Sequence, residues 1–335
     1  MPKRYLTIVL ILALVLGGCA KPSVEQKQYN ATFLDVFDTV TAVVGRAESQ
    51  EAFQAAAQQV QDELLKYHQL FDIYNDYPGV ANLKTINDNA GVAPVAVDPG
   101  IIDMLLDCRA YYELTGGKVN AAMGSVLRLW HDAREKGNKL PEDEALQEAA
   151  QHCAWDTIQI DEEKGTVYIS DPDQRLDVGA IAKGWAVQKV AEMVPKGLLI
   201  SVGGNVVATG PKTLDGTAWV VGVNDPDGGS TYLHTLNITS GAVVTSGDYQ
   251  RYFVVDGQMY HHIIDPVTLY PSRLWRSVTV ICADSGLADA LSTALFVLPL
   301  EEGKALLQKC GAEAMWVDQN GDFHYSQGFE NYVRT

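Results

Sequence analysis

Residues 198–202 read LLISV and residues 219–223 read WVVGV, and these two runs set the fold class of the chain. Each run is short and apolar, contains β-branched residues and is bounded by Gly, Asp, Asn or Pro, which is typical of a β-strand between turns. The same pattern recurs at residues 166–170, 233–238, 252–255 and 277–281. The second half of the chain is therefore predicted to form β-sheets.

Helical patterns precede and interrupt these strands. Apolar residues recur at helical spacing in residues 49–70, 180–194, 286–298 and 301–310. Asp98 is expected to cap another helix that ends at the glycines 116 and 117, and the acidic residues after Pro141 favour one more. Because strands and helices do not alternate strictly, a doubly wound fold is disfavoured. We predict an α+β fold in which helices pack on mixed or antiparallel sheets.

The N-terminus has the features of an exported lipoprotein. Lys3 and Arg4 precede an apolar run that is too short to remain as a membrane-spanning helix, and Leu-Gly-Gly leads directly into Cys19. We predict a signal peptide over residues 1–18, a lipid on Cys19, a tether over residues 19–30 and a folded body over residues 31–335. The mature protein would then be held at the outer face of the cytoplasmic membrane, or on the periplasmic side of a membrane. Ordinary secretion with an incidental cysteine is the less favoured alternative.

Charge and cysteine spacing restrict the ligands. The formal net charge of −17 argues against a nucleic acid partner, because phosphate backbones are bound by basic surfaces. A small anionic ligand therefore needs a local site. Four cysteines follow Cys19 and no two have CxxC spacing, which argues against a cysteine-rich metal site.

Residues 177–184 read DVGAIAKG and pass from a predicted strand into a predicted helix. The small residues allow a ligand to approach the backbone, the helix N-terminus offers free N–H groups to an anion, and Lys183 adds a positive charge. A phosphate site is one interpretation. A tight turn with a surface lysine is the alternative, and the segment alone does not distinguish the two.

A carboxylate lies within the predicted helix 286–298, which is apolar nearly all round. Asp289 and Thr293 are four residues apart, so their oxygens lie on one helical face. A buried carboxylate is costly without a partner, and Mg²⁺ would provide one because it prefers oxygen ligands. A capping or ion-paired Asp289 beside a core threonine is the alternative.

Two adjacent histidines, His261 and His262, precede Ile-Ile-Asp-Pro at residues 263–266. Neighbouring side chains on a strand point to opposite faces, so only one histidine is expected to face a site. That histidine could accept a proton from a hydroxyl nucleophile near neutral pH. A hydrogen-bonded structural role is the alternative.

Taken together and in this order, five segments resemble the ApbE family, the FAD:protein FMN transferases. They are DVGAIAKG at 177–184, SVGGN at 201–205, TSGDYQRYF at 245–253, HHIIDP at 261–266 and ADALSTA at 288–294. The resemblance implies an ApbE-like architecture related to the T-fold. It also implies the activity: members bind FAD with Mg²⁺, cleave its pyrophosphate and transfer FMN to a Thr or Ser hydroxyl of a partner protein, releasing AMP.

The same resemblance assigns site residues. Asp177 and Lys183 correspond to FAD contacts, and His262 corresponds to the family's candidate base. The implied metal ligands are the backbone carbonyl of Ala180 with Asp289, Ser292 and Thr293. The implied flavin positions are Phe37, Tyr74, Lys118, Val119, Asn120 and Ile263. Phe-Asp-Thr at 37–39, Lys-Val-Asn at 118–120 and Leu269 stand where members commonly have Met-Gly-Thr, Ala-Phe-Asp and Gly.

The implied partners are FAD, a flavin-acceptor protein such as a membrane redox-complex subunit, and the membrane through the lipid anchor. Three other functions remain open: a lipoprotein that stores or delivers FAD, an enzyme that hydrolyses FAD to FMN and AMP, and a solute-binding lipoprotein of a transporter. The last of these explains neither Asp289 with Thr293 nor the Lys183 segment.

Overall fold

The computed structural model describes residues 26–137, 139–229 and 231–335. The predicted signal peptide and Cys19 lie outside these residues. Within the described ranges, no helix combines the length and the apolar character that crossing a membrane requires.

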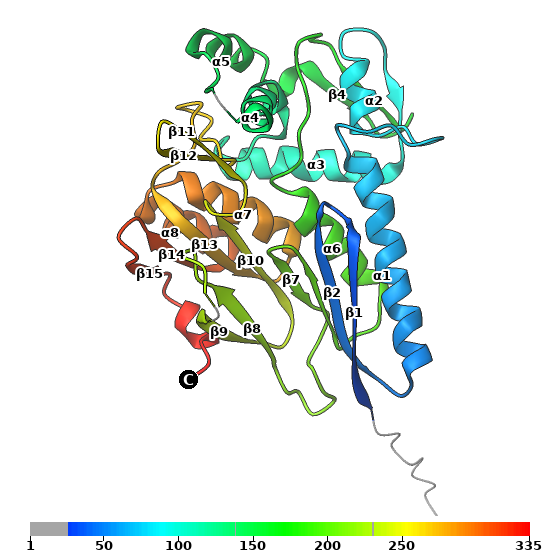
Figure 1. The fold of residues 1–335 in the computed structure, drawn as a ribbon. Coiled ribbons are helices and arrows are strands. Elements are labelled where there is room, and N and C mark those ends of the chain that lie inside the picture. Colours follow the sequence, from blue (N-terminus) through cyan, green and yellow to red (C-terminus); the bar gives the residue numbers. More distant parts are fainter. Residues whose placement is uncertain (1–25, 138, 230) are drawn as a thin grey trace, which may run out of the picture.

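An eight-stranded sheet forms the centre of the fold (Figure 1). In spatial order its strands are β1 (Lys27–Val36), β2 (Thr39–Ala47), β6 (Leu198–Val202), β7 (Asn205–Ala208), β10 (Gly241–Gly247), β13 (Trp275–Cys282), β14 (Glu313–Asp318) and β15 (Phe323–Tyr325). Smaller sheets join β3 (Val95–Ala96), β5 (Thr166–Ile169) and β4 (Ile158–Asp161), β8 (Trp219–Asn224) with β9 (Tyr232–Ile238), and β11 (Tyr252–Val255) with β12 (Gln258–His261). Every strand pair in the described ranges is antiparallel, and the predicted α+β class is confirmed.

The first two strands are absent from the predicted elements. They pair from Lys27 opposite Ala47 to Val36 opposite Thr39, so residues 27–30 belong to a strand and not to the tether. Strand β1 is the outer strand of the sheet and most of its side chains are exposed or only partly buried, which removes the apolar alternation that marks a strand. The two-residue turn between β1 and β2 has φ of 52° at both of its positions, as a tight hairpin turn requires.

Helices cover one face of the large sheet (Figure 1). They include α1 (Gln50–Phe71), α3 (Pro99–Leu114), α6 (Ala182–Met193), α7 (Ser285–Val297) and α8 (Leu300–Cys310). Ser49 caps α1, and Asp98 caps α3 as the sequence predicts. Helix α6 begins two residues later than expected, because residues 178–181 form a turn. Helix α7 is buried on nearly every side, which agrees with its apolar composition.

The opposite face of the sheet packs against the β8–β9 hairpin and the short helix η3 (Phe329–Tyr332). A third apolar cluster joins α4 (Gly124–Lys136) and α5 (Asp143–Ala150) to the β11–β12 hairpin. The remaining helical segments are α2 (Leu83–Asp88), η1 (Ala121–Met123) and η2 (Trp155–Thr157). The third cluster matters most for function, because it places the β11–β12 hairpin above one end of the large sheet (Figure 1).

Candidate active site

A cavity of about 720 Å³ lies where the ends of several sheet strands meet α4, α6 and α7. This volume is within the usual range for small-molecule sites. All the predicted site residues of the body except Ser292 line the cavity. These are Phe37, Tyr74, Lys118, Val119, Asn120, Asp177, Ala180, Lys183, His262, Ile263, Asp289 and Thr293.

Ser292 is fully buried and does not line the cavity. Its hydroxyl lies 2.8 Å from the hydroxyl of Ser246 and donates to the backbone carbonyl of Asp289 at 2.9 Å. Its hydroxyl thus joins α7 to Ser246 of β10, a residue that itself lines the cavity. The role of Ser292 as a metal ligand stays a prediction.

The contact between α6 and α7 positions Asp289. The backbone N–H of Gly184 donates to Asp289 Oδ2 at 2.8 Å, across helices that are 105 residues apart in sequence. A Cβ atom at position 184 would lie 2.3 Å from the Ser285 carbonyl and 2.5 Å from Asp289 Cβ. Only glycine allows the two helices to approach this closely. This close approach explains why the DVGAIAKG segment ends in glycine at position 184.

The hydrogen bond from Gly184 to Asp289 leaves the backbone carbonyl of Ala180 without its usual helical donor. In the first turn of α6, Ala182 N donates to Val178 O and Trp185 N donates to Ile181 O, as expected for a helix. Gly184 N donates to Asp289 instead of to Ala180, and no hydrogen bond to the Ala180 carbonyl is found among the described residues. Ala180, Asp289 and Thr293 thus bring a free carbonyl, a buried carboxylate and a hydroxyl to one cavity wall, a donor set that suits Mg²⁺.

We expect Gly184→Ala to lower the free energy of unfolding by about 1–3 kcal/mol, because the added methyl group overpacks the α6–α7 contact. Thermal or urea unfolding measures this. Gly303→Ala in α8 is the matched control: its new methyl group would meet the side chains of Leu295 at 3.0 Å and Trp316 at 3.2 Å but no backbone atom, and alanine favours the helix. Equal stability of the two variants would contradict the proposed role of Gly184.

The Asp177 side chain closes the turn before α6. Its Oδ1 accepts the N–H of Gly179 at 2.8 Å, and burial raises the pKa of its carboxyl above the ordinary value. Lys183 lines the same cavity one turn further along. The positive end of the α6 dipole and the charge of Lys183 therefore face the cavity from one side.

Both histidines line the cavity, but their rings have different partners. His261 is buried, with Nε2 2.6 Å from the Ser272 carbonyl and Nδ1 accepting the N–H of Ile263. The Nδ1 atom of His262 is buried with no partner in the described part of the chain. Burial, together with the positive charges of Arg251 and Lys183, lowers the pKa of His262 to about 3. His262 is therefore neutral in the free protein at physiological pH.

Among the cavity residues that were not predicted as site residues are His131, Arg134 and Arg251. The ring of His131 stacks on that of Tyr74 with 4.8 Å between centroids, and Arg134 Nη2 lies 2.9 Å from His131 Nδ1. Both come from α4, and Arg251 precedes β11. Burial, with the charge of Asp177, raises the pKa of Tyr74 to about 12. Helical spacing would reveal that His131 and Arg134 share a face, but not that this face reaches the cavity.

The positions that depart from the common family pattern have clear structural roles. Asn120 donates to the Cys153 carbonyl at 3.0 Å and accepts the N–H of Ala122, so its amide is committed to the fold. Lys118 Nζ lies 3.9 Å from Asp265 Oδ1. Leu269, at φ 63°, adopts a conformation that favours glycine, and its burial in the third apolar cluster compensates for the strain.

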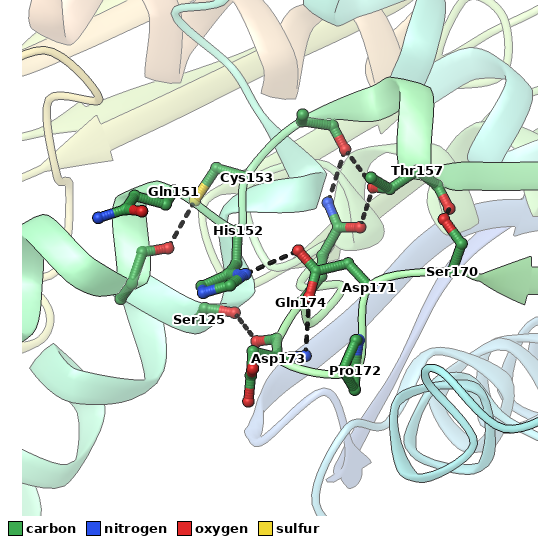
Figure 2. Close-up of polar contacts among 12 residues, drawn as sticks. Ser125, Gln151, His152, Cys153, Thr157, Ser170, Asp171, Pro172, Asp173 and Gln174 are labelled. Carbon is green, nitrogen blue, oxygen red and sulfur yellow. Dashed lines mark hydrogen bonds and ion pairs between the residues drawn. The ribbon is translucent and has the colours of Figure 1, made fainter.

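A second cluster of titratable residues lies outside the cavity (Figure 2). His152, Asp171 and Asp173 bring ligand-type atoms within 4.8 Å of one another. His152 Nδ1 lies 2.7 Å from Asp171 Oδ2, and this pair connects the segment after α5 to the segment after β5. The hydrogen bond to Asp171 raises the pKa of His152. Burial opposes ionisation of Asp171, but the bonds from His152 and from the Asp173 N–H lower its pKa overall.

We expect this pair to stabilise the protein by about 1 kcal/mol in mildly acidic solution only. The His152 contribution is complete below its ordinary pKa of 6.5 and is lost as the pH rises through its raised folded value. The Asp171 contribution is complete above its ordinary pKa of 3.8 and is lost as the pH falls through its lowered folded value. Melting of wild type and His152→Ala at pH 5.5 and pH 9 tests this, and a difference that is larger at the higher pH would refute it.

The fold and the site define a class of protein: an antiparallel α+β enzyme with one cavity that combines a free carbonyl, a carboxylate, a lysine at a helix N-terminus and a neutral histidine. The sequence model of the ApbE family matches residues 34–316. The chain belongs to the ApbE family.

Individual relatives agree with this assignment. A protein of Treponema pallidum (strain Nichols) named FAD:protein FMN transferase is 35% identical over 272 residues, which is 76% of this chain and 75% of the relative. A crystal structure of the ApbE protein from Thermotoga maritima is 30% identical, with a TM-score of 0.84, and covers 92% of this chain and 100% of its own. The flavin transferase ApbE from Vibrio cholerae, at 22% identity and a TM-score of 0.75 over 92% of this chain and 100% of its own, shares the fold.

Proposed function

We propose that the protein transfers FMN from FAD to a Thr or Ser hydroxyl of an acceptor protein, with Mg²⁺, and releases AMP. The observation that carries the proposal is that one cavity brings together three kinds of functional group. They are oxygen donors in the turn before α6 and on α7, a lysine at the positive end of α6, and a neutral histidine. The names of the relatives from Treponema pallidum and Klebsiella pneumoniae, both FAD:protein FMN transferases, support it.

The residues present fit a magnesium ion. Asp289 and Thr293, one helical turn apart, and the free carbonyl of Ala180 would hold it together with oxygens of the bound diphosphate. When bound, Mg²⁺ would neutralise charge on the phosphate oxygens. Lys183 and the positive end of the α6 dipole would attract the same diphosphate from the other side. The stacked rings of Tyr74 and His131 provide an aromatic wall for the flavin.

The group transfer is a single displacement at phosphorus. The acceptor oxygen forms a bond to the FMN phosphorus while the bond from that phosphorus to the bridging oxygen breaks, and AMP leaves with the bridging oxygen. His262 accepts the proton of the acceptor hydroxyl. Because Nδ1 is enclosed without a partner, the ring atom available for this step is Nε2. The protein thus positions the hydroxyl, holds the diphosphate and receives one proton.

We also propose that the mature protein is exported and held by a lipid on Cys19 at the outer face of a membrane. The short apolar run and the Leu-Gly-Gly-Cys sequence support this. Its acceptor would then be an exported protein, or a membrane redox-complex subunit with a hydroxyl exposed on that side. Blocking export of the chain should leave the purified body active but abolish labelling of the acceptor in cells.

The deciding experiment incubates the purified body with FAD, Mg²⁺ and an exported acceptor fragment. We expect AMP in solution and an added FMN on the acceptor, detected by mass spectrometry and by flavin fluorescence that survives denaturation. AMP and free FMN without labelled acceptor would instead indicate hydrolysis. Binding of FAD with neither product would indicate a flavin carrier, and both outcomes would overturn the proposed transfer.

A further inference from the structure

Strand β11 has an unpaired edge beside the cavity. It pairs with β12 on one side, and no strand of the described ranges pairs with its other side. The N–H of His262 donates to the carbonyl of Arg251 at 3.1 Å, and the register places the next hydrogen-bonded pairs at 253 with 260 and 255 with 258. The N–H and C=O groups of Tyr252 and Val254 therefore point away from β12. They have no hydrogen-bond partner in the described structure.

The two faces of this hairpin differ. Arg251 and Phe253 alternate with the two edge residues, and both line the cavity together with His262, the partner of Arg251. Phe253 is 9% exposed, whereas Tyr252 is 48% and Val254 is 51% exposed. The edge thus combines free backbone groups with exposed apolar side chains, and it continues directly into the cavity wall. An open strand edge of this kind is a template for pairing with another chain.

We propose that the acceptor protein docks by adding an extended segment to the free edge of β11, and that its hydroxyl-bearing residue follows this segment, where the acceptor chain passes Arg251 into the cavity. This inference rests on the proposed function, which requires a protein hydroxyl to reach His262. Residues opposite each other in a strand pair point to the same face, with Cβ atoms about 4.5–5.5 Å apart. A residue opposite Arg251 therefore faces the cavity, but it lies two strand spacings, about 10 Å, from His262, which pairs with Arg251 on the other side. The hydroxyl-bearing residue must accordingly follow the paired segment and turn into the cavity.

The kind of partner follows from this geometry. Strand addition uses backbone hydrogen bonds for affinity, so the segment must be extended and lie outside the partner's own sheets. Its residues opposite Tyr252 and Val254 would face those two exposed side chains, which favours apolar or β-branched residues there. The acceptor is therefore a protein that presents its hydroxyl in a surface loop or tail and not in a helix.

Hydrogen exchange resolved by residue tests the docking directly. In the free protein the amides of Tyr252 and Val254 should exchange fast, while those of Phe253 and Val255 are held in the hairpin. Adding an acceptor fragment whose hydroxyl residue is replaced by Ala should slow exchange at Tyr252 and Val254 by about tenfold or more, since each gains a backbone bond. Unchanged exchange at both amides with saturating fragment would overturn the proposal.

A variant provides the second test. Val254→Pro removes one outward N–H without removing a bond to β12, and proline is tolerated at such edge positions. We expect the KM for the acceptor to rise about tenfold, the value of one lost backbone bond, with FAD affinity unchanged. Val254→Thr, which keeps the backbone, is the matched control. If the wild type labels no acceptor, the proposed function fails; if it labels the acceptor and Val254→Pro does so with the same KM, only the docking proposal fails.

Discussion

Asp289→Asn is expected to reduce Mg²⁺-dependent flavin transfer by about 10³-fold or more. Asparagine has nearly the same volume, and its side-chain oxygen can still accept the N–H of Gly184, so the α6–α7 contact should survive. The variant lacks the negative charge that the proposed metal site requires. Alanine would be a poorer test, because it would also leave the buried N–H of Gly184 without a partner and so disturb the fold.

The measurement is the transfer rate as a function of Mg²⁺ concentration, together with FAD binding in the absence of metal. Asp284→Asn is the matched control: it makes the same charge change on α7, at the N-cap that accepts the Leu287 N–H, where asparagine caps equally well. We expect Asp284→Asn to keep wild-type kinetics. An Asp289→Asn protein with the wild-type rate at the same Mg²⁺ concentration would remove Asp289 from the metal site.

The local parts of the site were predictable from the sequence, because helical spacing is local. Asp289 and Thr293 lie on one face of α7 and line the cavity, as their separation of four residues predicts. His261 ends β12 and His262 follows it, and both line the cavity. The His261 ring is held by the Ser272 carbonyl and the Ile263 N–H, so only the His262 ring is available to a ligand. For α7 the neighbours in sequence are also the neighbours in space, and the helical period decides the geometry.

The remaining parts depend on contacts between distant segments. Gly184 is required because α7 approaches α6 to within the space of one methyl group, and no pattern within 177–184 reveals that approach. The hydrogen bond between Ser292 and Ser246 joins α7 to β10, and helical spacing alone does not reveal it. Strand β1 escapes detection because it lies at the edge of the sheet and its side chains are largely exposed. Tertiary packing decides all three features.

The charge distribution connects composition to the site. The chain carries a formal net charge of −17, so an anionic ligand is repelled by the molecule as a whole. Four basic side chains nevertheless line the cavity, namely Lys118, Arg134, Lys183 and Arg251, together with four aspartates, Asp38, Asp72, Asp177 and Asp289. The formal charges of the lining therefore balance, which makes the cavity less repulsive to an anion than the chain as a whole. These cations also act on the neighbouring histidine, since Arg251 and Lys183 help to lower the pKa of His262.

His262→Ala is expected to lower the rate of transfer by about 10²–10⁴-fold and to leave FAD affinity within about threefold. In the free protein His262 is neutral above about pH 3, because burial and the nearby cations oppose its protonation. The diphosphate of bound FAD would offset the charges of Arg251 and Lys183, and the pKa of His262 should then rise in the complex. A proton acceptor must be neutral, so activity is lost as the pH falls through this raised value.

The pH profile separates a base from a merely structural histidine. For the wild type, the acid limb of kcat should lie at higher pH than that of kcat/KM, since the former reports the complex and the latter the free enzyme. In His262→Ala the residual rate should lack the acid limb of kcat. His234→Gln, at a partly buried histidine of β9 outside the cavity, is the control and should keep both limbs. If His262→Ala loses FAD binding and transfer to the same degree, His262 contributes to binding the flavin nucleotide and some other group accepts the proton.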